Sequence, residues 1–279
     1  MARPAAPGVR VRKWSAGQWK ESPDAVVTEE PLQLMLDGSN LSVVMRTPGN
    51  DVELAAGLLF AEGIVRSRDE IRSIRISAEA DESEARIPLD ASIVESNTVD
   101  VHLAGEPRRR PERSMLASSA CGVCGAVMID DLKRDLAVLP AGQKMNAALL
   151  PALSERLRSG QGVFDVTGGL HAAGLFDIAG ELQCMREDVG RHNAVDKVVG
   201  RMLLDGRLPA RETILVVSGR AGYEIVQKSI SAGIPMLAAV GAPSSLAVAL
   251  AREFNQTLVG FLRGERFNVY SSAERLTSI

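Results

Sequence analysis

The sequence predicts a protein of the α/β class (α+β in its first part), with a small N-terminal α+β domain before an α/β domain that has a mostly parallel sheet. Strand and helix patterns alternate over 213–262, and this βαβ alternation is typical of parallel strands joined by right-handed crossovers. Two of these strands, 213–217 and 234–240, are continuous apolar runs, as expected where helices cover both faces. A basic, proline-broken run at 108–113 marks the boundary between the two patterns, and it is either a solvated linker or a docking strip for an acidic partner.

Composition narrows the classes of function. The chain has 279 residues with 32 basic and 35 acidic side chains, so its formal net charge is −3. A generic nucleic-acid binder is usually basic, and no apolar stretch reaches the length of about 18 residues that a membrane span needs. The first residues lack the pattern of a signal peptide, and an odd count of three cysteines argues against a disulfide framework. We therefore expect a soluble, cytoplasmic protein with reduced thiols that binds neither nucleic acid nor membrane.

The N-terminal part reads as a lead followed by a compact unit. Residues 1–25 are expected to form a flexible lead with edge strands. Within them, residues 9–20 hold both tryptophans and are expected to form a strand pair that packs on the first domain. The first domain is expected to span 26–115. It begins with a hairpin, because two apolar runs flank the turn signal Asp37-Gly38-Ser39-Asn40. The expected elements are strands at 32–36, 41–45, 71–76 and 99–103 and a helix with apolar residues at 52, 55, 56, 58 and 59.

The second domain is expected to span 116–279. Helical spacing of apolar residues and alternating or continuous apolar runs define its elements. The expected helices are 146–158, 191–204, 223–231 and 245–255. The expected strands are 163–166, 171–177, 182–187, 213–217, 234–240 and 257–262, with a hairpin between 171–177 and 182–187.

The strongest signal for chemistry is a Cys-x-x-Cys motif, Cys121 and Cys124, set among small residues. Such surroundings leave a thiol accessible, and a helix expected over 126–136 would place Cys124 near its N-terminus, where the helix dipole lowers a thiol pKa. Because the thiolate is the nucleophile, the motif favours a thiol that carries a group as a persulfide. Three alternatives stay open: half of a zinc site completed by Cys184 and a histidine, a thioredoxin-like redox pair, or a structural pair. Cys184, inside an expected strand, is predicted to be a buried packing residue.

Further candidates lie where expected strands end. His171 follows two glycines and is either an anion-binding or proton-transferring group or a structural histidine. The run 187–197 is dense in ionisable side chains, so it is either a solvated helix entry or a phosphate site at a helix N-terminus. The loops 218–223 and 241–245 follow buried strands at the carboxyl edge of the expected sheet, where open α/β sheets bind ligands.

A pair of arginines completes the set. Arg263 and Arg266 flank a glycine near a strand end, and arginine forks match phosphate oxygens, although a solvated turn is the plain alternative. In their order along the chain, the motifs resemble those of the formate dehydrogenase accessory sulfurtransferase family (the FdhD/NarQ family of sulfur carrier proteins). The resemblance rests on the segments 119–125, 165–171, 187–197, 218–220 and 261–270.

The resemblance implies a specific function, which the composition of the chain does not indicate. Such proteins accept sulfur as a persulfide from a cysteine desulfurase and pass it to a molybdenum (or tungsten) bis-molybdopterin guanine dinucleotide cofactor before its insertion into the formate dehydrogenase catalytic subunit. In this sequence, a sulfurtransferase of that kind would carry the persulfide on Cys121, with Cys124 assisting or resolving. The guanine-nucleotide moiety of the cofactor is expected to bind a segment made of Phe261, Leu262, Arg263, Gly264, Glu265 and Arg266.

The resemblance also implies that the second domain is cytidine-deaminase-like. The sequence departs from the deaminase zinc pattern, because no glutamate lies two residues after His171 and no proline precedes the Cys-x-x-Cys motif. We therefore expect neither deaminase activity nor bound zinc. Because the cofactor has two nucleotide arms, we expect a two-fold homodimer.

Overall fold

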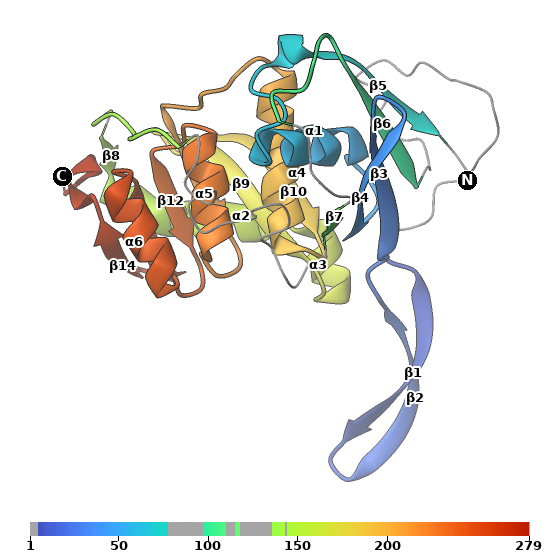
Figure 1. Cartoon of the computed structure of the whole chain (residues 1–279). Helices are drawn as coiled ribbons and strands as arrows, with labels where there is room; N and C mark the ends of the chain where they lie inside the picture. The colour runs from blue at the N-terminus through green and yellow to red at the C-terminus, as the bar shows by residue number, and fades with distance from the viewer. Residues whose placement is uncertain (1–4, 78–96, 110–114, 118–135, 143, 279) are drawn as a thin grey trace.

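The computed structural model of the chain describes residues 5–77, 97–109, 115–117, 136–142 and 144–278 (Figure 1). Cys121 and Cys124 lie outside the described residues, as does nearly all of the helix expected over 126–136. The described part is a mixed α/β structure built around a six-stranded and a five-stranded sheet, which confirms the predicted class. The division into domains near 115 stays a prediction.

The larger sheet has the strand order β10-β9-β11-β12-β13-β14. Its three central strands run parallel, as the alternating pattern predicts: β11 (Thr213–Val217), β12 (Met236–Ala239) and β13 (Thr257–Arg263). The outer strands pair antiparallel with their neighbours: β9 (His171–Asp177), β10 (Leu182–Asp188) and β14 (Arg266–Ser271). The parallel part is therefore the centre of the sheet, and the predicted hairpin of β9 and β10 forms one flank.

Helices cover both faces of the larger sheet. In β11, Leu215 and Val217 belong to one core, and Ile214 and Val216 belong to the other. A strand turns alternate side chains to opposite faces, so a strand covered on both faces is apolar throughout. One face is covered by α4 (Arg191–Leu204), α5 (Tyr223–Ser231) and α6 (Ser245–Glu253), and the other by α2 (Leu150–Ser159).

The smaller sheet has the strand order β5-β6-β3-β4-β7. Strands β3 and β4 form the predicted antiparallel hairpin, and the predicted helix α1 (Asp51–Ala61) follows it. The strands are β3 (Glu30–Leu36), β4 (Ser39–Arg46), β5 (Ile71–Ser77), β6 (Thr98–Leu103) and β7 (Met115–Ala117). Two short strands, β8 (Met145–Asn146) and β15 (Leu276–Thr277), pair in parallel. Short 3-10 helices lie at Arg68–Glu70, Ala147–Leu149 and Ala273–Arg275.

Helix α1 packs on α4 so closely that their backbones meet at glycines (Figure 1). A Cβ atom on Gly57 of α1 would overlap the backbone carbonyl of Asp196, and one on Gly200 of α4 would overlap the backbone carbonyl of Glu53. Glycine is the residue that permits this approach, because it has no Cβ. As a result, one continuous core runs from β3 through α1 and α4 to β11.

One predicted strand is wrong. Residues 163–166 lie in a short helix, α3 (Gly162–Thr167). Val163, Phe164 and Val166 favour a strand by intrinsic propensity, but tertiary contacts override such preferences. The Glu187 side chain accepts a hydrogen bond from the backbone N–H of Phe164 at 3.3 Å, and Gly168 ends the helix in the left-handed conformation with φ 66°.

The first two strands, β1 (Gly8–Ser15) and β2 (Gln18–Ala25), form an antiparallel hairpin that projects from the rest of the molecule (Figure 1). The strand pair is confirmed, but the expectation that it lies on the first domain is wrong. Trp14 and Trp19 face each other across the hairpin, with ring centroids 5.1 Å apart and exposed fractions of 58% and 59%. Both faces of the hairpin are largely exposed, so it has no apolar side to bury. We call residues 8–25 the arm.

Candidate functional site

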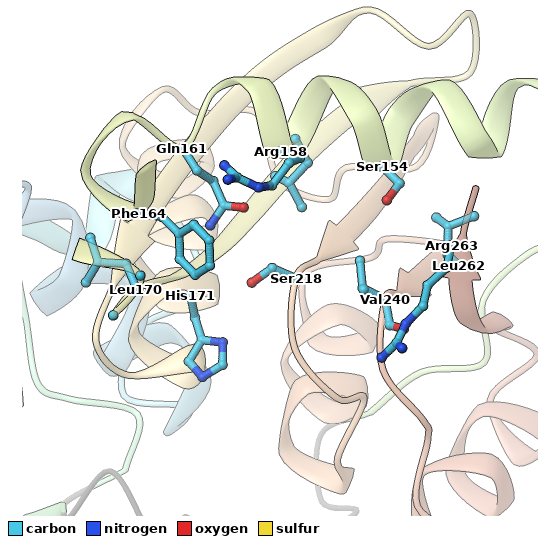
Figure 2. A pocket seen from close by; sticks show the side chains of 13 residues that line it. Ser154, Arg158, Gln161, Phe164, Leu170, His171, Ser218, Val240, Leu262 and Arg263 are labelled. Carbon is cyan, nitrogen blue, oxygen red and sulfur yellow. The ribbon is translucent and has the colours of Figure 1, made fainter. Parts of the chain in front are cut away.

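A pocket of about 450 Å³ opens at the carboxyl edge of the parallel strands, against α2 and α3 (Figure 2). Ser218 follows β11, Val240 follows β12, and Leu262 and Arg263 end β13. The antiparallel strand β9 begins at the same edge, with His171. Open α/β sheets bind ligands at this edge, so the pocket lies where the sequence predicts a ligand site.

Hydrogen bonds to β9 fix the position of Ser218. Its backbone N–H donates to the Ala172 carbonyl, and its Oγ accepts from the Ala172 N–H, both at 2.9 Å. Because Oγ accepts this bond, the hydroxyl proton stays available to donate to a ligand. The backbone of the next residue, Gly219, lies close to the imidazole ring of His171. A Cβ atom on Gly219 would lie only 3.3 Å from Nδ1 of that ring. Two motifs that are distant in the sequence therefore meet in one site.

His171 offers hydrogen bonds rather than a positive charge. Burial lowers its pKa below the ordinary histidine value, and the positive charge of Arg191 lowers the pKa further, while Asp188 opposes the shift. The ring is therefore neutral at neutral pH. A neutral imidazole has one donor and one acceptor nitrogen, so His171 suits a polar ligand group better than it suits a phosphate charge.

The predicted cofactor-binding segment contributes Leu262 and Arg263 to the pocket lining. Leu262 is buried, and Arg263 donates from Nε to the carbonyl of Val240 at 3.2 Å, which holds its guanidinium at the pocket edge. The structure therefore brings Arg263 together with His171 and Ser218.

The rest of that segment lies beside the pocket rather than in its lining. Phe261 is 44% exposed, adopts a left-handed φ of 55°, and donates its N–H to the Gly241 carbonyl at 3.0 Å. Gly264 and Glu265 form the turn between β13 and β14, and Arg266 pairs with Arg263 across it. Gly264, Glu265 and Arg266 are all exposed.

Helices α2 and α3 supply side chains that no motif in the sequence predicts. Arg158 forms an ion pair with Asp165 at 2.6 Å, and its guanidinium carbon lies 4.7 Å from the centre of the Phe164 ring. Ser154 and Gln161 also line the pocket, and Gln161 is only 2% exposed. No spacing pattern marks these residues, since only the packing of α2 and α3 over the strand ends brings them to the site.

The charged side chains of the pocket lining are positive. They are Arg158 and Arg263, and none of the 13 lining residues is a carboxylate. Arginine donors match phosphate oxygens, and small-molecule sites commonly measure about 300–1,000 Å³. The pocket therefore suits a phosphate-bearing anion of about the size of one nucleotide.

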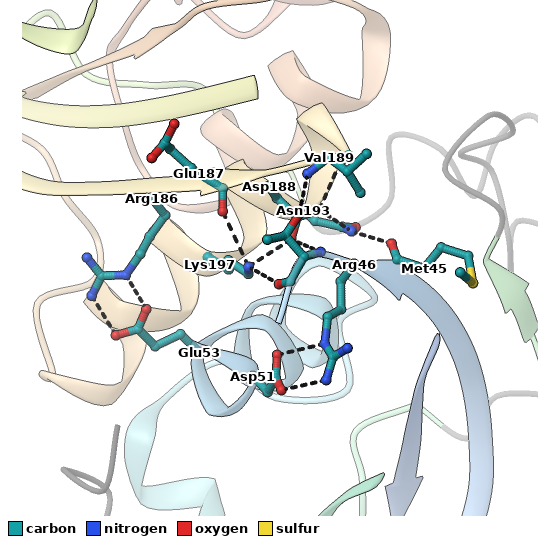
Figure 3. A network of polar contacts seen from close by, with 12 residues as sticks. Met45, Arg46, Asp51, Glu53, Arg186, Glu187, Asp188, Val189, Asn193 and Lys197 are labelled. Carbon is teal, nitrogen blue, oxygen red and sulfur yellow. Dashed lines mark hydrogen bonds and ion pairs between the residues drawn. The ribbon is translucent and has the colours of Figure 1, made fainter. Parts of the chain in front are cut away.

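The charged run 187–197 is largely buried, which neither interpretation of the sequence anticipates (Figure 3). Asp188 and Lys197 are 0% and 1% exposed, and Lys197 Nζ lies 2.7 Å from Asp188 Oδ2. Both groups also bind Thr47, which follows β4: Nζ donates to its carbonyl at 2.9 Å, and Oδ2 accepts from its N–H at 3.2 Å. The run thus ties β10 and α4 to the hairpin of the smaller sheet.

Two further contacts reinforce this joint (Figure 3). The Asn193 amide donates to the Met45 carbonyl at 2.8 Å and to Asp188 Oδ1 at 2.9 Å. Arg186 binds the carboxylate of Glu53 on α1, with Nη2 2.6 Å from Oε1. The residues of this joint do not line the pocket, although Asp188 lies opposite the lining residue His171 in the pairing of β10 with β9.

His192, on the first turn of α4, faces Glu224 of α5, with 3.4 Å between Nε2 and Oε2. Burial, reinforced by Arg191, Lys228 and His171, lowers the pKa of His192 to about 3. Burial raises the pKa of Glu224. The His192 ring is therefore neutral at neutral pH, and its role is structural, because it packs between α4 and α5.

Cys184 is a buried packing residue, as predicted, with 7% of its surface exposed. Burial raises the pKa of its thiol, which keeps it protonated. Within the described residues, no group of three or more His, Cys, Asp or Glu side chains could hold a metal ion. In the same part of the chain, every helix is too short or too polar to cross a membrane.

Comparisons with known proteins agree on one family. The model of the FdhD/NarQ family matches residues 27–277. A sulfur carrier protein FdhD from Mycolicibacterium paratuberculosis is 47% identical over 272 residues, covering 96% of this chain and 97% of that protein. One from Sulfolobus acidocaldarius is 41% identical over 268 residues, covering 96% and 97%. A crystal structure described as a formate dehydrogenase accessory protein from Desulfotalea psychrophila superposes with a TM-score of 0.75 at 26% identity, covering 98% of this chain and all of that one.

Proposed function

The chain belongs to the FdhD/NarQ family, and from this premise we propose that it is a sulfur carrier for the maturation of formate dehydrogenase. It accepts sulfur from a cysteine desulfurase as a persulfide on Cys121. It passes that sulfur to a molybdenum (or tungsten) bis-molybdopterin guanine dinucleotide cofactor, which then enters the formate dehydrogenase catalytic subunit. In this proposal the chain is a sulfurtransferase that works in the cytoplasm. The molybdenum (or tungsten) cofactor is its substrate and not its own prosthetic group.

The observation that carries the proposal is the pocket at the carboxyl edge of the parallel strands. Its lining is positively charged, through Arg158 and Arg263, and offers the hydroxyl of Ser218 and the neutral ring of His171 as hydrogen-bonding groups. These groups fit the phosphates and polar ring edges of a nucleotide. The volume of about 450 Å³ fits one nucleotide arm of the cofactor rather than the whole of it.

The residues beside the pocket would extend this binding. Arg266 lies across the turn from Arg263, so both arginines would face phosphate groups that leave the pocket. Phe261, exposed on the same strand end, would cover an apolar part of the ligand. Because one pocket holds one arm, a two-fold homodimer would present two pockets to the two arms. Light scattering that shows only monomer in the presence of cofactor would contradict the dimer.

Loading of the carrier is a thiol exchange. The Cys121 thiolate attacks the outer sulfur of the desulfurase persulfide, the S–S bond of the donor breaks, and the donor leaves as a cysteine thiolate. The new S–S bond is the persulfide of Cys121, so no electrons are gained or lost in the step. A thiolate is required, which is why a lowered pKa at the motif would favour loading.

Delivery uses the second cysteine. The Cys124 thiolate attacks Sγ of Cys121, forms a Cys121–Cys124 disulfide, and releases the outer sulfur as hydrosulfide beside the cofactor. The two cysteines supply the two electrons that reduce the transferred sulfur. A cellular dithiol reductant then restores both thiols by a further exchange.

Mass spectrometry of the loaded carrier tests the proposal. Incubation of the full chain with a cysteine desulfurase and cysteine should add about 32 Da to the peptide that holds Cys121. The Cys121→Ser variant should lose this addition, whereas Cys184→Ser, at a buried packing position, should keep it. An unmodified Cys121 in the presence of an active donor would refute the proposal.

A further inference from the structure

The most unusual polar side chain of the pocket is Gln161, which precedes α3. It lines the pocket and is 98% buried, yet its Nε2 has no hydrogen-bond partner among the described residues. Buried amide donors in folded proteins are almost always satisfied, so an unsatisfied one at a pocket wall indicates a partner that arrives with the ligand.

The surroundings of Gln161 favour one orientation of its amide. In Figure 2 the amide oxygen lies on the side of the Arg158 guanidinium, and the amide nitrogen points toward the pocket and Phe164. A guanidinium carries donors only, so it favours the oxygen of a neighbouring amide. Arg158 is itself held by its ion pair with Asp165 and by the ring of Phe164. In this orientation Gln161 presents its Nε2 donor to the pocket.

The pocket has two chemically different ends (Figure 2). Arg263 lies at one end, and Gln161, Phe164 and Leu170 lie together at the other, where His171 also lies, while Ser218 lies between the two ends. Arg158, which lies near Gln161, is already paired with Asp165, which leaves Arg263 to bind a phosphate. A nucleotide whose phosphate binds Arg263 would place its base against Gln161 and the Phe164 ring. The base is then the ligand group that meets the Nε2 donor.

We propose that Gln161 is a specificity-determining residue of this pocket, and that its Nε2 donates a hydrogen bond to the carbonyl oxygen of a 6-oxopurine. Guanine has an acceptor oxygen at this position, whereas adenine has an amino donor, which would face the Gln161 donor without a hydrogen bond. A site built to pair with a substrate group rejects the analogue that lacks it, because the buried polar group is left unpaired. This inference rests on the proposed function, since that function brings a guanine nucleotide to the pocket.

Binding of simple nucleotides to the full chain tests the inference. GDP, IDP and ADP would be titrated by calorimetry into the wild type, Gln161→Leu and Gln161→Glu. IDP keeps the 6-oxo group and lacks the 2-amino group of GDP, so it isolates the contact in question. Gln183→Leu is the matched control, because Gln183 is exposed on β10 and is outside the pocket lining.

The wild type and Gln183→Leu should bind GDP and IDP at least about tenfold more tightly than ADP. Gln161→Leu should bind GDP about tenfold more weakly and lose most of this preference, with ADP binding unchanged. Gln161→Glu places an acceptor where the donor was, so it should favour ADP over GDP, an inversion that misfolding cannot produce. A GDP preference that survives in both Gln161 variants overturns the role of Gln161 and leaves the proposed function intact. Failure of the wild type to bind any of the three nucleotides overturns the nucleotide pocket itself.

Discussion

Lys197 and Asp188 form an ion pair of 2.7 Å between two side chains that are almost completely buried. Lys197 lies on α4 and Asp188 ends β10, and both also bind Thr47 beyond the hairpin of the smaller sheet. A buried charge is tolerated when its remaining hydrogen-bonding positions are filled, and here backbone and side-chain groups from both sheets fill them. The pair therefore belongs to the joint between the sheets rather than to the pocket.

Replacing Lys197 by methionine should destabilise the protein by about 3–5 kcal/mol, because the Asp188 charge would stay buried without its partner. The free energy of unfolding in urea measures this. In a double-mutant cycle, Lys197→Met with Asp188→Asn should cost less than the sum of the two single changes. Glu181→Gln, at an exposed ion pair with Arg156, is the control and should change stability by less than about 1 kcal/mol. Additive costs in the cycle would show that the pair is not coupled.

Adding a methyl group to Gly57 should force α1 and α4 apart, since its Cβ would overlap the backbone of Asp196. Backbone cannot move aside as a flexible side chain can, so Gly57→Ala should cost about 1–3 kcal/mol or more. Gly105→Ala is the matched control, because no atom lies within 4 Å of the new Cβ there. Thermal unfolding compares the two variants, and equal melting temperatures would contradict the close contact of the helices.

The low pKa of His192, about 3 in the folded chain, makes stability depend on pH. The unfolded chain binds a proton near pH 6.5 and the folded chain does not, so the stability from this group is present above pH 6.5. It is lost toward pH 3, at about 1.4 kcal/mol per pH unit. Glu224, whose pKa is raised, changes stability in the opposite direction over the acid range. His192→Gln should therefore flatten the fall of unfolding free energy between pH 6.5 and 4, and parallel curves would contradict the burial of a neutral ring.

Truncating Arg263 to alanine should weaken GDP and ADP binding alike, by about tenfold or more, because a charged hydrogen bond to phosphate contributes about 1.5–3 kcal/mol. Calorimetry at two salt concentrations measures this affinity. The affinity of the variant should also depend less on salt than the affinity of the wild type. Arg211→Ala, at an exposed position outside the pocket lining, should behave as the wild type. A change confined to GDP would instead assign Arg263 to the base.

Much of the fold follows from local pattern. The predicted bounds of three elements agree with the structure: 191–204 with α4, 213–217 with β11 and 223–231 with α5. The apolar residues of these segments follow a clear helical spacing or a continuous strand run, which is the strongest signal in a sequence. The strand predicted at 163–166 fails for the opposite reason, since a short run of β-branched residues carries a weak preference that the contact with Glu187 overrides.

The site was partly predictable. His171, Ser218 and Arg263 each follow or precede a recognisable strand end, and the rule for open α/β sheets brings such ends together. Gln161 and Arg158 carry no such signal, because they reach the pocket only through the packing of α2 and α3. The burial of Lys197 was equally hidden, since its partner Thr47 lies 150 residues away in the chain.

The arm has a practical consequence for spectroscopy. The chain has two tryptophans, and both, Trp14 and Trp19, lie on the arm with more than half of their surface in water. Tryptophan emission therefore reports on the arm alone, and melting of the two sheets would pass almost unseen by this probe. A blue shift of the tryptophan emission would show that another surface has covered the arm. The fluorescence of the unlabelled protein can therefore detect binding of a second molecule to the arm.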